Sequence, residues 1–198
     1  MTLIQLALLL IGRVPLFDSL CITFGTAGTG GFGIVNDSLG SYSTYCQVVT
    51  TIFMILFGVN FSAYYLILTK KFRQAFKYEE VRYYFGIIAV AIVIIALNTA
   101  HLFRNLLTAF QQAAFQVGSI ITTTGFSSTD FNQWPALSKT VLVLLMFVGA
   151  CAGSTGGGIK VSRILILCKA AKKEFQLYLH PNAVKRSRWM TRSSPMIS

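Results

Sequence analysis

Long apolar stretches alternate with short polar ones along most of this chain. Residues 47–69 and 83–100 carry no charged side chain, and the apolar stretch 138–168 is interrupted by a glycine-rich run. About 20 apolar residues in a helix cross the hydrocarbon core of a bilayer, so each stretch predicts a membrane-spanning helix. We therefore expect an all-α integral membrane protein rather than a soluble domain with buried core helices.

Two Thr/Gly loops lie between the apolar segments, and the second repeats the first 94 positions later, from Thr29 to Thr123. Glycine lets the backbone bend so that carbonyl oxygens face one axis, and threonine adds a hydroxyl oxygen. A cation selectivity filter needs these properties. The candidate ion-binding filter residues are Thr29, Gly30, Gly31, Phe32, Thr123, Thr124, Gly125 and Phe126.

The elements around the two loops follow one order. Residues 3–11 extend only about 14 Å as a helix, so they predict a truncated first span. Residues 15–27 predict a short helix before the first loop, and 101–121 contain one before the second. We expect two helix–pore-helix–filter-loop–helix repeats, at 1–69 and 83–174, a basic cytoplasmic linker at 70–82 and a basic cytoplasmic tail at 175–198.

The last span contains the run from Gly149 to Gly158. Each glycine costs a helix about 1 kcal/mol relative to alanine, so three in succession predict a break at mid-membrane depth. Irregular backbone at that depth survives only when protein or a water-filled cavity covers it, so the break is expected to line a pore. For Gly149 and Gly153 alone, close helix packing through a GxxxG pair is an equally good interpretation.

Basic residues gather in two places. The formal net charge is +11, and the linker 70–82 and the C-terminal end hold most Lys and Arg, whereas 33–46 and 127–137 hold none. Positive charge marks the cytoplasmic side, which predicts a multi-pass protein of the cell membrane with both loops outside and the linker and C-terminus in the cytoplasm. The same residues are expected to contact anionic lipid. We do not expect a nucleic-acid partner, because the sequence shows no basic stripe interleaved with aromatic residues.

The sequence contains no motif typical of a metal site, a phosphate-binding loop or an enzyme active site. The four cysteines show no CxxC spacing, and the two histidines do not form a metal pair. The run from Gly153 to Lys160 differs from a phosphate-binding loop, because Ile159 separates Gly158 from Lys160. We expect no enzyme activity and no cofactor. Asp18 and Asp130 lie near the predicted outer mouth, where they would attract cations or cap local turns.

Several motifs resemble those of one family, the potassium-translocating membrane subunit of Trk-type K⁺ uptake systems in the Trk/Ktr/HKT superfamily. The most specific is the run from Cys151 to Lys160, and the two Thr/Gly loops and the sequence around Asn60 add to it. The resemblance implies four fused pore repeats, of which this chain matches the second and third. It also implies that Gly31 and Gly125 are the central filter glycines, that neighbouring carbonyls coordinate K⁺, and that 150–158 obstructs the closed pore. The implied gating-loop residues are Gly153, Ser154, Thr155, Gly156, Gly157, Gly158 and Lys160.

The first and fourth repeats of the resembled family have no counterpart here, so two loops supply half a filter. We expect the chain to be the central part of a K⁺ uptake protein that functions with the missing repeats, with Na⁺ or H⁺ coupling left open. One alternative is a half-pore that must homodimerise, and another is a non-conducting fragment that associates with other subunits. The resemblance adds a homodimer and a cytoplasmic nucleotide-binding regulatory subunit as partners. For Lys160, tuning of the pore field and snorkelling to the inner interface remain equal interpretations.

Overall fold

The computed structural model describes residues 1–70, 79–103 and 105–179, and within these ranges it contains helices and no strand. The all-α expectation is confirmed for this part of the chain. Parts of the expected linker and tail, 71–78 and 180–198, lie outside the described residues. The elements are α1 (Thr2–Ile11), α2 (Leu16–Ala27), α3 (Thr44–Phe57), α4 (Phe61–Leu68), α6 (Glu79–Thr99), α7 (Leu106–Ile121), the 3₁₀ helix η1 (Phe131–Gln133), α8 (Ala136–Val148) and α9 (Val161–Leu179).

The helix starts follow from local sequence. Ser43 and Asn60 cap α3 and α4, since their side chains accept hydrogen bonds from the backbone N–H groups of Cys46 (3.3 Å) and Ser62 (2.8 Å). Pro15 and Pro135 directly precede α2 and α8, where the missing N–H of proline removes no helical hydrogen bond. Capping side chains therefore mark the starts of α3 and α4, and prolines mark the starts of α2 and α8.

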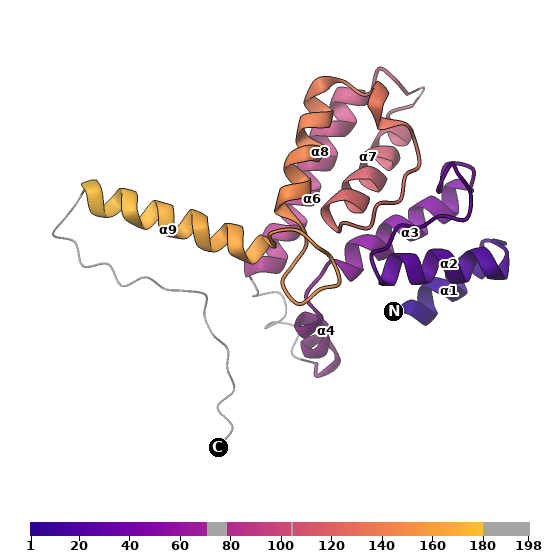
Figure 1. Ribbon diagram of the computed structural model, residues 1–198, viewed down its shortest axis with the longest axis horizontal. Helices are drawn as coiled ribbons and strands as arrows, with labels where there is room; N and C mark the ends of the chain where they lie inside the picture. Colours follow the sequence, from indigo (N-terminus) through magenta and orange to yellow (C-terminus); the bar gives the residue numbers. More distant parts are fainter. Residues whose placement is uncertain (71–78, 104, 180–198) are drawn as a thin grey trace.

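The helices form two groups that meet through α3 and α7 (Figure 1). In the first group α1, α2 and α3 contact one another, and in the second α6 contacts α7 and α8. One apolar cluster fills each group, but Phe115 and Phe126 of the second half belong to the cluster of the first. These two rings therefore join the halves in one core.

The expected span over 47–69 is not one continuous helix. The chain turns by 92° between α3 and α4. Local residues and one distant contact account for the turn: Gly58 ends α3, Asn60 caps α4, and the freed Gly58 carbonyl accepts a hydrogen bond from Cys151 N (3.1 Å). Among the described helices, α6 alone is long and apolar enough to cross a membrane by itself, and the bent pair meets the same criteria when counted together.

The expected domain limits also differ from the helix ends. α6 begins at Glu79, within the expected linker 70–82, and α9 continues to Leu179, beyond the expected limit at 174. Between α8 and α9, residues 149–160 form an irregular loop that contains the glycine run. α9 then extends away from both helix groups (Figure 1).

Substituting alanine for Gly58 is expected to destabilise the bend. An added Cβ would overlap the Tyr84 hydroxyl and lie 2.8 Å from Thr122 Cγ2. Overpacking of this kind costs about 1–3 kcal/mol, which lowers the melting temperature of a chain of this size by about 5 °C. Thermal unfolding in detergent measures the change. Gly86→Ala is the control, because a Cβ there meets nothing within 4 Å. Equal melting temperatures for the two variants would contradict the prediction.

Candidate functional site

The two Thr/Gly loops leave their helices with the same hydrogen bonds. After α2, the N–H of Gly30 donates to the Gly25 carbonyl (2.8 Å), and after α7 the N–H of Thr124 donates to the Ser119 carbonyl (2.9 Å). Each donor and each acceptor in the second loop lies 94 positions after its counterpart. The sequence repeat therefore corresponds to a repeat of backbone geometry.

The backbone of both loops adopts left-handed conformations. Thr29 and Thr123 have φ angles of 50° and 57°, which are unusual for a β-branched residue. Such conformations cost about 1–3 kcal/mol each and occur mainly at functional sites. Gly31 and Gly125 follow with φ angles of 66° and 92°, which glycine adopts readily. The strain recurs at equivalent positions of the two loops.

The two loops lie directly against each other. A Cβ added to Gly31 would overlap the Thr124 carbonyl oxygen and lie 2.8 Å from the carbonyl carbon of Gly125. Farther along, Leu39 N donates to the Ser127 carbonyl (2.8 Å). Segments that are distant in sequence therefore place their carbonyl-bearing backbones together.

The glycine-rich loop between α8 and α9 contacts both Thr/Gly loops. The Thr29 hydroxyl lies 3.1 Å from the Thr155 carbonyl oxygen and donates to it. The Gly157 N–H donates to the Thr123 hydroxyl oxygen over 2.6 Å. A Cβ on Gly156 would lie 2.9 Å from the Thr122 carbonyl oxygen. All three candidate segments thus meet at one place.

The far side of the glycine-rich loop is held by groups that the sequence did not single out. Glu80, only 6% exposed, accepts a hydrogen bond from Ala152 N (2.6 Å). Phe61 N donates to the Gly153 carbonyl (3.1 Å). Figure 1 shows this loop beside the junction of α3 and α4. Lys160, with a φ angle of 80°, donates to the Gly156 carbonyl, so its ammonium group closes the loop on itself.

Equivalent aromatic residues of the two loops differ in exposure. Phe126 is 1% exposed, and its ring lies 3.1 Å from where a Cβ of Gly25 would be. Phe32 is 83% exposed. The second loop is therefore supported by the helix that precedes the first loop, whereas the ring of the first loop has no such support among the described residues.

The two acidic residues expected near the outer mouth, Asp18 in the first turn of α2 and Asp130 before η1, have local partners. Asp130 caps η1, and the hydrogen bond from Asn132 N to this carboxylate (3.0 Å) lowers the pKa of Asp130. Asp18 accepts a hydrogen bond from the Tyr42 hydroxyl (2.8 Å), and burial together with this bond raises the pKa of Tyr42 to about 12. Capping explains Asp130 without a transport role.

The described residues contain no group of three or more His, Cys, Asp or Glu side chains that could hold a metal ion. Every cysteine among them is a free thiol. Oxygen atoms for an ion at this site would come from backbone carbonyls and threonine hydroxyls.

Comparison with known proteins gives a consistent result. Residues 7–192 match the TrkH family, described as a cation transport protein. The chain is 34% identical over 186 residues to the Trk system potassium uptake protein TrkH of Salmonella typhimurium, covering 92% of this chain and 38% of that protein. It is 32% identical over 174 residues to the Trk system potassium uptake protein TrkG of Escherichia coli, covering 86% of this chain and 36% of that protein.

A solved structure agrees with these relatives. The crystal structure of the potassium transporter TrkH from Vibrio parahaemolyticus superposes with a TM-score of 0.89 at 30% sequence identity, over 94% of this chain and 41% of that one. The chain thus spans less than two fifths of the length of the curated relatives that it matches. Sequence and fold together show that the chain belongs to the TrkH family of cation transport proteins.

Proposed function

We propose that this chain forms part of the K⁺ pathway of a Trk-type potassium uptake protein in the cell membrane. One observation carries the proposal: the two Thr/Gly loops and the glycine-rich loop converge, with one hydrogen bond from the Thr29 hydroxyl to the Thr155 carbonyl and one from Gly157 N to the Thr123 hydroxyl oxygen. Membership of the TrkH family and similarity to proteins named potassium uptake proteins support K⁺ as the cation and a transport role rather than an enzymatic one.

The chemistry of the pathway is replacement of water by fixed oxygen atoms. K⁺ loses its hydration shell only if protein carbonyl oxygens replace it. The left-handed glycines Gly31 and Gly125 supply the turns that a ring of inward carbonyls needs. In this proposal α2 and α7 are pore helices, and residues 29–32 and 123–126 are filter loops.

The filter requires more than two loops. Phe126 is covered by the helix of the other repeat, and the equivalent Phe32 is 83% exposed. A further repeat placed beside the first loop would cover Phe32 in the way that α2 covers Phe126. The chain also matches only 38% of its TrkH relative from Salmonella. We therefore assign transport to the complete protein, of which this chain forms the central repeats.

The glycine-rich loop is the proposed gate. It lies against Thr122 and Thr123, on the side of the filter loops where their helices end. Its backbone is fixed by hydrogen bonds rather than by apolar packing alone, so it can leave this position without unfolding a helix. Residues 150–158 would obstruct the pathway in the closed state.

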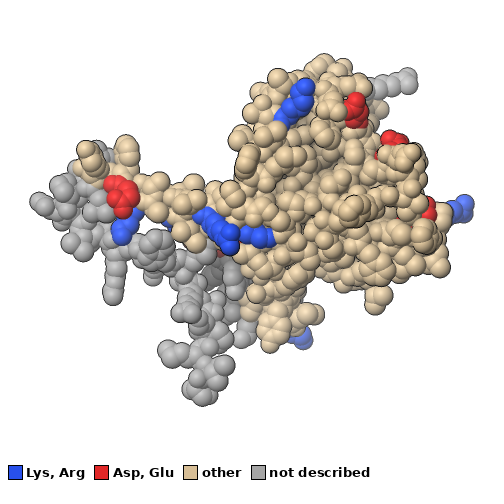
Figure 2. Space-filling view, in the orientation of Figure 1, with Lys and Arg blue, Asp and Glu red and all other residues tan. Residues whose placement is uncertain are grey.

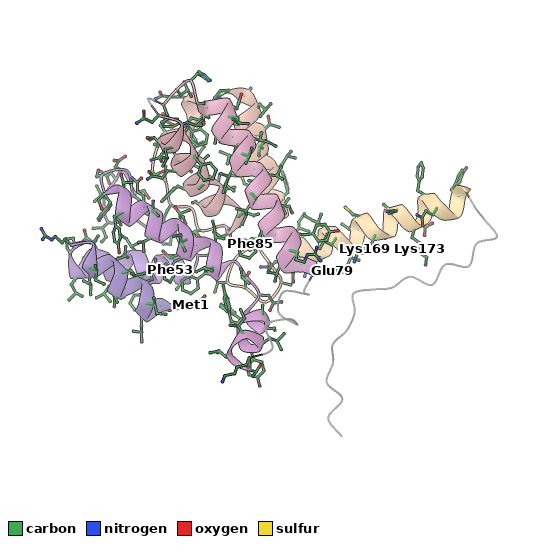
Figure 3. The ribbon with its side chains drawn as sticks, turned by 180° about the vertical axis from the view of Figure 1, so that it is seen from behind. Met1, Phe53, Glu79, Phe85, Lys169 and Lys173 are labelled. Carbon is green, nitrogen blue, oxygen red and sulfur yellow. The ribbon has the colours of Figure 1, made fainter. Side chains whose placement is uncertain are left out.

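Charge supports an orientation with the gate toward the cytoplasm. Blue side chains follow α9, while most of the helical body is uncharged (Figure 2). Lys169 on α9 forms an ion pair with Glu79 at the start of α6 (Figure 3). The N-terminal end of α6 and the basic helix α9 therefore lie on the same side. Positive charge favours the cytoplasmic face and anionic lipid. On that side, a second copy of the subunit and a nucleotide-binding regulatory subunit are the proposed partners.

Ion flux through reconstituted protein tests the function. Protein expressed from its complete gene and placed in liposomes is expected to take up K⁺ in preference to Na⁺, and to restore low-K⁺ growth to cells that lack K⁺ uptake. Chemical crosslinking of the same sample reports whether copies pair. Pairing without any flux would contradict the transport proposal and favour a fragment that only associates with other subunits.

A further inference from the structure

A chain of buried amide side chains connects the segments that follow the two filter loops. Gln47 on α3 is 6% exposed, and Gln112 on α7 is 8% exposed. Neither residue touches the filter loops, and neither belongs to the proposed gate. Buried amides in an apolar helix bundle are costly unless each polar atom has a partner, so their partners indicate what they do.

Gln47 joins the two repeats. Its Nε2 donates to the Leu39 carbonyl (3.0 Å), in the segment that follows the first filter loop. Its Oε1 accepts from Nε2 of Gln112 (3.2 Å) and from Nε2 of Gln111 (3.2 Å), both on α7. One side chain therefore links the end of the first loop to the helix that supports the second.

Gln112 continues the connection to the second loop. Its Oε1 accepts a hydrogen bond from the Ser128 hydroxyl (2.5 Å), two residues after Phe126. Next to it, Ser127 N donates to the Ser38 hydroxyl oxygen (3.1 Å), and Leu39 N donates to the Ser127 carbonyl (2.8 Å). The bonds thus form a closed ring that runs from Leu39 through both glutamines to Ser128 and back.

The direction of every bond in this ring is determined. A carbonyl oxygen only accepts, so the Gln47 amide must turn its NH₂ group to Leu39 and its oxygen to α7. Gln112 must then donate to Gln47 and accept from Ser128. Each polar atom has a partner of the required kind, and a ring of this type allows one arrangement of the two segments.

We propose that Gln47 and Gln112 are positioning residues that hold the two filter loops at a fixed separation and thereby set the preference for K⁺ over Na⁺. The inference rests on the proposed filter function. Both ions are coordinated by the same oxygen atoms, so discrimination depends on how many carbonyls face the ion and how firmly they are held. A ring that ties together the segments directly behind both loops controls that arrangement.

The test is the concentration of Na⁺ that halves K⁺ uptake in liposomes containing protein expressed from its complete gene. The variants are Gln47→Met and Gln112→Met, which keep the side-chain length and remove the hydrogen bonds. Either substitution leaves polar partners in the ring unsatisfied and loosens the tie between the two loops, so we expect the K⁺/Na⁺ preference to fall about fivefold or more. The control is Gln176→Met, an exposed glutamine on α9.

The outcomes separate this proposal from the proposed function. If the variants lose uptake or melting temperature but keep the wild-type preference, the glutamines are structural only and the proposal is overturned. If the wild-type protein itself moves no K⁺, the filter assignment fails instead. Should either variant fail to fold, Ser128→Ala removes one donor from the ring with little change in volume, and an unchanged preference in that variant also overturns the proposal.

Discussion

Replacing Gly31 with alanine is expected to lower K⁺ uptake about 100-fold, the loss that a displacement of about 1 Å causes at a precisely built site. The added Cβ would overlap the Thr124 carbonyl oxygen of the other loop, a backbone atom that cannot rotate away as a side chain could. The φ angle of 66° adds strain of its own. The carbonyls that would face the ion must therefore move. The effect is measured as K⁺ uptake by cells that lack their own K⁺ uptake systems, normalised to the amount of the variant protein in the membrane.

Two further variants show whether the loss arises in the filter. At Gly125 a Cβ meets nothing within 4 Å, but the φ angle is 92°. Gly125→Ala is therefore expected to reduce uptake through backbone strain, because its Cβ meets no neighbour. Gly86→Ala, with open space on α6 and an ordinary helical backbone, is expected to keep wild-type uptake. Wild-type uptake in the Gly31 and Gly125 variants would remove the filter assignment.

Replacing Gly156 with valine is expected to raise the passive K⁺ leak, whereas replacing Gly31 lowers K⁺ uptake. A Cβ at this position would lie 2.6 Å from the Ala150 Cβ and 2.9 Å from the Thr122 carbonyl oxygen. The loop must then withdraw from the second filter loop. Overpacking that destabilises the closed position of the loop by about 2 kcal/mol shifts the equilibrium between the closed and displaced positions about 30-fold toward the displaced one. Efflux from K⁺-loaded liposomes measures the leak.

Ser154→Ala is the control in the same loop. Its hydroxyl donates only to the Cys151 carbonyl (2.6 Å), and the smaller side chain leaves the contact with the filter loops intact. We expect its leak to match that of the wild type. A Gly156→Val protein that folds but leaks no more than Ser154→Ala would show that residues 150–158 are not the barrier.

The elements of this protein follow largely from its sequence, because apolar length and glycine runs act locally. The helices that precede both Thr/Gly loops end where the sequence predicts, at Ala27 and Ile121. The bend after Gly58 was missed, since one glycine in an apolar stretch is usually tolerated in a helix. Part of its cause lies elsewhere in the chain, because the glycine-rich loop supplies a donor, Cys151 N, to the freed Gly58 carbonyl.

The contacts of the candidate site could not be predicted in the same way. Nothing in a single sequence states that Gly31 lies against Thr124, because this depends on how two helix groups pack. Glu80 lies within the expected basic linker 70–82, and only the fold shows that it is buried and bonded to Ala152 N. Gln47 is the first residue of the apolar stretch 47–69, and its hydrogen bonds to α7 depend on how the helices pack.

In the proposed arrangement the hydroxyl groups of Thr29 and Thr123 contact the glycine-rich loop and also border the filter, which would link ion occupancy thermodynamically to the position of the gate. While the glycine-rich loop is in place, the Thr29 hydroxyl donates to the Thr155 carbonyl and the Thr123 hydroxyl oxygen accepts from Gly157 N, so both hydroxyl groups are engaged. Withdrawal of the loop releases them, so an ion that uses them binds the open form more tightly. Linkage then requires that the bound ion favours the open form by the same factor. In this protein a filled filter would itself act as the signal to open.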